Sequence, residues 1–147
     1  MTSEGMAVAL AEAEAARTRG EVPIGAALVR DGVVIAAAGN RTIADDDPTA
    51  HAEMIVIRAA AASLGSQRLV GADLYVTLEP CTMCAAAISF ARIRRLYFGA
   101  RDSKGGAVES GVRFFSQPTC HHAPEVYGGI GEHEAGKLLT EFFAARR

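Results

Sequence analysis

Residues 73–100 constrain the fold more than any other stretch of the chain. Residues 73–79 (DLYVTLE) predict a strand, Pro80 marks the change from strand to helix, and residues 81–92 (CTMCAAAISFAR) predict a helix. Residues 94–100 (RRLYFGA) predict a further strand. A strand, a helix and a strand in succession indicate a sheet that is covered by helices.

The remaining segments extend this pattern into the α/β class. Residues 23–30 and 33–39 predict two strands, and the Asp31-Gly32 dipeptide between them is a strong hairpin signal. Further helices are expected at residues 3–19, from 49 or 50 to 64 and at 132–147, with a short strand at 125–127. The apolar side of the last helix is expected to hold Leu138, Leu139, Phe142 and Phe143. The resulting order implies one mixed sheet with helices on both faces, a three-layer α-β-α architecture.

The length and composition predict a single domain that spans residues 1–147. A chain of 147 residues buries roughly two thirds of its unfolded surface, which suffices for a core without disulfides. No apolar run reaches about 18 residues, and the polar start of the chain is not typical of a signal peptide. The 3 cysteines make a poor disulfide framework and suit a reducing compartment. We therefore expect a cytoplasmic protein with no membrane partner.

The charge distribution is uneven, although the formal net charge is only −2. Residues 1–60 carry five basic and nine acidic groups, whereas residues 92–113 carry six basic and two acidic groups. A local positive strip on an acidic protein fits a short anionic ligand better than a long duplex, so no DNA partner is expected. A solvated charged face is the alternative interpretation of the strip.

Three residues have the chemistry of a zinc site. Cys81 and Cys84 are one helical turn apart and can point the same way, and His51 stands at the start of another predicted helix. Catalytic zinc sites use three protein ligands and leave the fourth position to water, whereas structural sites fill all four. No fourth ligand lies close in sequence, so the count predicts one open, catalytic zinc ion per chain.

Glu53 lies two residues after His51, in the first turn of the same predicted helix. A carboxylate beside an activated water can take its proton and pass it on. A glutamate in a first helical turn is also common simply because it compensates the helix dipole. Beside His51 and the cysteine pair, the catalytic interpretation is the better one.

His51-Ala52-Glu53 followed by Pro80-Cys81-Thr82-Met83-Cys84 resembles the H-x-E…P-C-x-x-C signature of the zinc nucleobase deaminases. Segments 21–25, 39–41, 47–53, 74–81 and 98–102 are similar to the bacterial tRNA adenosine deaminases of the cytidine and deoxycytidylate deaminase superfamily. This resemblance implies a cytidine deaminase-like, five-stranded mixed sheet and a homodimer. It also implies that the substrate is a tRNA anticodon stem-loop, whose wobble adenosine is hydrolysed to inosine with release of ammonia.

The same resemblance assigns roles at the substrate pocket. It implies that Asn40 contacts the target nucleoside and that Asp102 touches the RNA near the target. Backbone groups of Ala52, Leu78 and Glu79 are implied to line the base pocket.

Two further RNA contacts are expected outside the pocket. By resemblance, Phe143 packs near the extruded RNA loop. His122 is a candidate RNA contact in segment 111–127, which departs most from the family, and an ordinary surface loop is an equal alternative. The neighbouring Cys120 is expected to be a spare thiol.

Two other functions remain open at this point. One is deamination of a free nucleobase or nucleoside, such as guanine, cytosine or cytidine, which needs the same zinc and the same Glu53. The other is a zinc-bound RNA-binding subunit without turnover, and Glu53 argues against it because such a subunit needs no proton shuttle.

Overall fold

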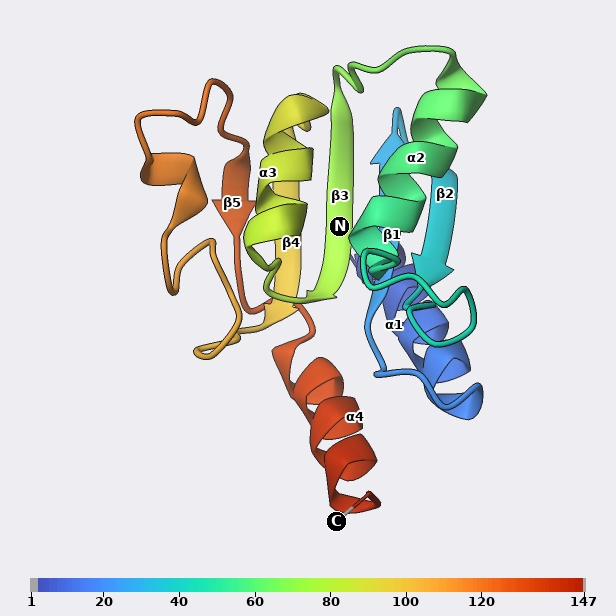
Figure 1. The fold of residues 1–147 in the computed structure, drawn as a ribbon. Coiled ribbons are helices and arrows are strands. Elements are labelled where there is room, and N and C mark those ends of the chain that lie inside the picture. Colours follow the sequence, from blue (N-terminus) through green and yellow to red (C-terminus); the bar gives the residue numbers. More distant parts are fainter. Residues whose placement is uncertain (1–2, 147) are drawn as a thin grey trace.

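One five-stranded sheet lies between two pairs of helices in the computed structural model, which describes residues 3–146 (Figure 1). The helices are α1 (Ser3–Thr18), α2 (Ala52–Leu64), α3 (Thr82–Phe90) and α4 (Glu132–Ala144), with a short 3₁₀ helix η1 (Phe114–Ser116). The strands are β1 (Gly25–Arg30), β2 (Val33–Gly39), β3 (Ala72–Leu78), β4 (Arg95–Ala100) and β5 (Glu125–Tyr127).

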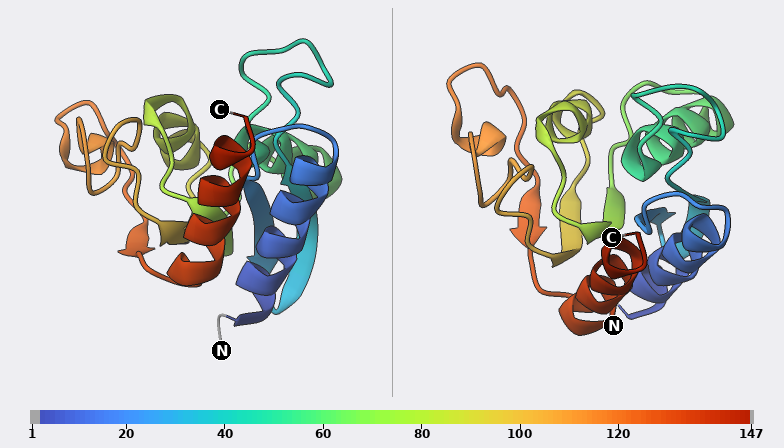
Figure 2. Two further views of the ribbon diagram at one scale, coloured as in Figure 1. Left: turned by 90° about the horizontal axis from the view of Figure 1, so that it is seen from below. Right: turned by 60° about the horizontal axis from the view of Figure 1, so that its bottom comes forward.

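The strand order is β2-β1-β3-β4-β5, with β1 antiparallel to both neighbours and β3, β4 and β5 parallel. Figure 2 shows α1 and α4 on one face of the sheet and α2 and α3 on the other. The mixed sheet and the three layers confirm the predicted architecture. The Asp31-Gly32 turn has positive φ at both residues, as the tight hairpin predicted between β1 and β2 requires.

Alternate residues of the strands enter two separate cores. Leu74 and Val76 of β3 are buried in the core on the side of α2 and α3, whereas Tyr75 packs on the side of α1. Tyr75 stacks on Tyr97 of β4 with ring centroids 4.6 Å apart, and Tyr97 stacks on Tyr127 of β5. Both faces of the central strands are therefore covered, which explains their nearly continuous apolar sequence.

Three helix boundaries differ from the sequence prediction by two residues or more. α2 begins at Ala52, because the Asp47 carboxylate accepts hydrogen bonds from the N–H and hydroxyl of Thr49 and holds that residue in a turn. α3 ends at Phe90, two residues early. α4 ends at Ala144, and residue 147 of the predicted helix lies outside the described residues.

The predicted apolar side of α4 is only partly correct. Phe142 is buried, but Phe143 is 46% exposed, because adjacent residues of a helix do not share one side. None of the helices within residues 3–146 is long and apolar enough to cross a membrane.

The α1 helix packs closely on β1 at Gly25. A Cβ atom there would collide with the carbonyl oxygen of Ala9 and stand 2.5 Å from the backbone nitrogen of Ala13. Both contacts are backbone atoms of a helix, which cannot move aside without displacing α1. Gly136 in α4, by contrast, has no heavy atom within 4 Å of such a Cβ.

We expect Gly25→Ala to lower the free energy of unfolding by about 2 kcal/mol or more, as overpacking does. The matched change Gly136→Ala should raise it by about 0.5–1 kcal/mol, because alanine favours a helix over glycine. Chemical denaturation followed by circular dichroism measures both values. Equal stability of Gly25→Ala and the wild type would contradict the close approach of α1 and β1.

Candidate active site

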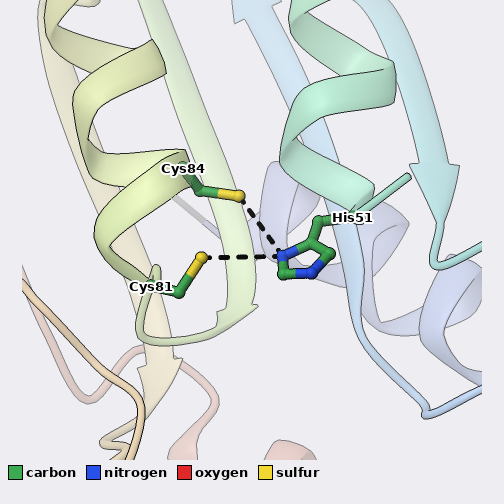
Figure 3. Close-up of side chains that lie close together, drawn as sticks. All are labelled: His51, Cys81 and Cys84. Carbon is green, nitrogen blue, oxygen red and sulfur yellow. Dashed lines mark hydrogen bonds between the residues drawn. The ribbon is translucent and has the colours of Figure 1, made fainter. Parts of the chain in front are cut away.

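The starts of α2 and α3 bring His51, Cys81 and Cys84 together (Figure 3). His51 and Cys81 are the N-cap residues of α2 and α3, and Cys84 lies in the first turn of α3. The Nδ1 atom of His51 lies 3.6 Å from Sγ of Cys81 and 3.5 Å from Sγ of Cys84. The three predicted ligands therefore meet, although 30 residues separate His51 from Cys81.

These distances fit a zinc ion. Zinc–sulfur bonds of about 2.3 Å and zinc–nitrogen bonds of about 2.0 Å at a tetrahedral angle separate the two donor atoms by about 3.5 Å. The donor atoms of the three residues all lie within 4.8 Å of one another. Two thiols and an imidazole form the donor set that zinc prefers.

The pKa values of the two neighbouring thiols are shifted in opposite directions. The hydrogen bond from Cys84 lowers the pKa of Cys81 to about 4, whereas that bond and burial raise the pKa of Cys84. A divalent cation stabilises both thiolates at once, and the positive ends of two helix dipoles assist it.

Glu53 lies beside this cluster in the first turn of α2. Glu53 is only 4% exposed, and burial raises the pKa of its carboxyl to about 7. The negative charge of Cys81 adds to this rise, and the His51 ring opposes it. Glu53 is not among the residues whose donor atoms converge, so it is free to act as an acid or base.

Asn40 holds the start of α2 in place. Its Oδ1 atom accepts a hydrogen bond from the N–H of Ala52 at 3.1 Å, and Arg19 donates to its backbone oxygen. The side chain is buried with its oxygen committed to the helix. Asn40 thus positions Ala52, which lies between His51 and Glu53. The sequence did not predict this role.

A groove of about 1100 Å³ brings together three of the predicted substrate contacts, Leu78, Asp102 and Phe143. Its other lining residues are Val22, Arg101, Ser103, Lys104, Gly105, Leu139, Thr140 and Arg146. Oδ1 of Asp102 accepts hydrogen bonds from the N–H groups of Lys104 and Gly105, so this carboxylate stabilises its own turn.

The side chain of Glu79 is the functional feature that the sequence analysis missed. Only its backbone was expected to matter, but its carboxylate is 2% exposed and accepts five hydrogen bonds from residues 102–110. Burial opposes ionisation, yet these donors outweigh it and hold the pKa of Glu79 below its ordinary value. In the sequence, the position of Glu79 directly before Pro80 was the only sign that its side chain has a structural role.

His122 lies apart from the cluster. Its Nε2 atom is 2.7 Å from the carbonyl oxygen of Ile93, which precedes β4, whereas Cys81 follows the opposite end of the parallel strand β3. Cys120 donates to the carbonyl oxygen of His122 and so helps to fix this loop. An RNA contact of His122 stays a prediction.

Known proteins resemble this chain over most of its length. The model of the cytidine and deoxycytidylate deaminase zinc-binding region matches residues 1–100. A tRNA-specific adenosine deaminase of Agrobacterium fabrum is 69% identical over 142 residues, covering 97% of this chain and 93% of the relative. A tRNA-specific adenosine deaminase of Bacillus subtilis is 45% identical, covering 97% of this chain and 88% of the relative.

Two solved structures show the same fold. One, from a study of A-to-I editing by tRNA:A34 deaminases, has a TM-score of 0.91 and 70% identity, and the match covers 92% of this chain and 99% of that one. A guanine deaminase of Bacillus subtilis has a TM-score of 0.67 and 31% identity over 97% of this chain and 92% of that one. From the matched region and these relatives, the chain belongs to the cytidine and deoxycytidylate deaminase family, a family of zinc-binding deaminases.

Proposed function

We propose that this chain hydrolyses the wobble adenosine of a tRNA anticodon loop to inosine and releases ammonia. The observation that carries the reaction type is the convergence of His51, Cys81 and Cys84 beside the buried Glu53. The choice of substrate is supported by the 69% identity to a tRNA-specific adenosine deaminase over nearly the whole chain.

His51 through Nδ1 and both cysteines through Sγ are the residues that hold the metal. Zinc, when bound there, acts as a Lewis acid that lowers the pKa of a water ligand toward 7. The contribution of the protein is to fix three donor atoms on two helix starts, and a zinc ion held by them would keep one position for water.

Glu53 moves the protons. Its carboxylate takes a proton from the attacking water and passes it to N1 of the adenine ring as the new C6–O bond forms. It then transfers the hydroxyl proton from the C6 oxygen to the amino group, which leaves as ammonia. Water and adenosine are thereby converted to inosine and ammonia, and Glu53 returns to its starting state.

The RNA is held along the groove beside the metal ligands. Asn40 and the backbone of Ala52, Leu78 and Glu79 surround the base, and Asp102 lies beside the RNA near the target. Phe143, exposed on α4, is available to the extruded loop. The anticodon loop suits such a site because its unpaired bases can be splayed out of the stack.

The similarity to tRNA-specific adenosine deaminases also supports an inference about assembly and location. We infer a homodimer in which each chain helps to shape the RNA site of its partner. We also infer a cytoplasmic location, because tRNA is the substrate.

Deamination of a free base is the second candidate. The guanine deaminase of Bacillus subtilis shares the fold at 31% identity, so the fold is compatible with both substrates. The positive residues of the groove, Arg101, Lys104 and Arg146, favour a polyanion over a neutral base.

Cys84→Ser should remove the zinc and lower the melting temperature, because metal binding is coupled to folding. The control is Cys120→Ser, since Cys120 is the remaining cysteine and its Sγ atom contacts Ser89 and His122 and not the metal ligands. Metal analysis of the purified proteins should find about one zinc per chain in the wild type and in the control. A folded Cys84→Ser protein with a full complement of zinc would refute the ligand set.

Glu53→Gln should retain zinc but lose turnover by about 10²- to 10⁴-fold, the usual effect of losing a general acid–base. Glu4→Gln makes the same charge change on an exposed side chain of α1, away from the groove, and should have normal turnover. Ammonia release from an anticodon stem-loop measures both. Undiminished turnover by Glu53→Gln would exclude the proton shuttle.

An anticodon stem-loop with wobble adenosine should have a higher kcat/KM than free adenosine, adenine, cytosine or guanine by at least about 100-fold. Contacts to the flanking nucleotides supply binding energy that a free base lacks. The measurement is a competition among these substrates with zinc-replete protein. If guanine or cytosine equalled the stem-loop, the free-base function would replace the tRNA function.

A further inference from the structure

We propose that Glu79 and Ser110 are positioning residues that hold the loop of residues 101–111 and direct the Arg101 guanidinium into the groove, where it binds an RNA phosphate. The inference rests on the proposed function, because it specifies how the same groove binds its RNA.

The carboxylate of Glu79 is the anchor of this loop. Oε1 accepts hydrogen bonds from the N–H of Asp102 at 2.9 Å and from the Ser110 hydroxyl at 3.0 Å. Oε2 accepts three more, from the N–H groups of Val108, Glu109 and Ser110 at 2.8–3.0 Å. Hydrogen bonds to a buried charge are strong, so one side chain fixes both ends of the loop.

The loop wraps tightly around this carboxylate. A Cβ atom on Gly106 would stand 2.5 Å from Cδ of Glu79, so only glycine fits at this position. The N–H of Ala107 donates to the carbonyl oxygen of Pro80 at 2.9 Å. The loop is therefore attached both to the side chain of Glu79 and to the segment that leads into Cys81.

Ser110 links the anchor to Arg101. A serine hydroxyl has a single proton, and here it is donated to Glu79. The lone pairs of the same oxygen therefore face Nε–H of Arg101, which donates to it at 3.2 Å. Nη2 of Arg101 donates to the carbonyl oxygen of Glu109 at 3.2 Å. The guanidinium is thus held from one side, which leaves three of its five N–H groups for a ligand.

Arg101 is held without being neutralised. Within residues 3–146, no carboxylate lies within 4.0 Å of its guanidinium, whereas Arg41, Arg94 and Arg95 each form an ion pair. Asp102 also lines the groove, but it accepts two N–H groups of its own turn. An ordered and unpaired guanidinium in a groove with further positive side chains is suited to a phosphate.

A double-mutant cycle separates positioning from general stability. The probe is a labelled anticodon stem-loop with inosine at the wobble position, which is not turned over, and the protein is zinc-replete. Arg101→Ala should weaken binding about tenfold and reduce the salt dependence by about one ion. Ser110→Ala should weaken binding about threefold in the wild type.

In the Arg101→Ala background, Ser110→Ala should weaken binding clearly less than in the wild type, because much of the effect of the hydroxyl passes through the arginine. Ser63→Ala removes an exposed hydroxyl from α2 and should change nothing in either background. An equal effect of Ser110→Ala in both backgrounds, or no effect in the wild type, would overturn the inference. A wild type that fails to bind the stem-loop would overturn the proposed function as well.

Limited trypsin digestion tests the anchor without RNA or activity. Glu79→Gln, with zinc content checked, should be cleaved after Arg101 and Lys104 at least about tenfold faster than the wild type, since local opening exposes these bonds. Cleavage after Arg58 in α2 should stay slow, which separates loop release from global unfolding. Glu109→Gln is the matched control in the same loop. Unchanged cleavage of the loop in Glu79→Gln would contradict the role of Glu79.

Discussion

The register between β1 and β3 is the constraint on which the site depends. Ala26 pairs with Val76, and the Thr77 hydroxyl accepts a hydrogen bond from the N–H of Gly25 at 3.1 Å. Because β2 runs antiparallel to β1, the last residues of β2 lie beside the first residues of β1. The last residues of β3 lie there too. The segments that lead into α2 and α3 therefore leave the sheet at the same end of its strands. A slip of one residue would shift one helix start by about 3.3 Å, comparable to the 3.5 Å that separates the ligand atoms.

Two buried carboxylates order the irregular segments on either side of the metal ligands. Glu21 accepts hydrogen bonds from Ile43, Ala44 and the hydroxyl of Thr42, and so fixes the segment between β2 and α2. Glu79 does the same for the segment after β4. A buried charge is costly unless it is fully paired, so each carboxylate favours the single loop conformation that supplies its donors. Specific hydrogen bonds order these loops, and in the loop after β4 they act together with the burial of Ala107 and Val108.

The candidate metal ligands and the groove lie in different parts of the molecule. The ligands and Glu53 belong to helix starts that are fixed by the sheet, and a guanine deaminase shares this fold. Most of the residues that line the groove belong to loop 101–111 and to α4. Under the proposed function, changes in these outer segments would alter the substrate without disturbing the helix starts that hold the metal ligands.

The sequence by itself determined the elements and the reacting groups. Short apolar runs, the Asp31-Gly32 turn and the spacing of Cys81 and Cys84 are local signals, and local signals can be read without coordinates. Glu53 was found because it lies two residues from His51.

Only the tertiary structure decided how the surrounding residues act. Oδ1 of Asn40 binds Ala52, 12 residues away, and the carboxylate of Glu79 binds Ser110, 31 residues away. His122 likewise lies beside the carbonyl oxygen of Ile93, 29 residues away. No local pattern encodes such pairs, because their partners become neighbours only after the sheet has brought distant segments together.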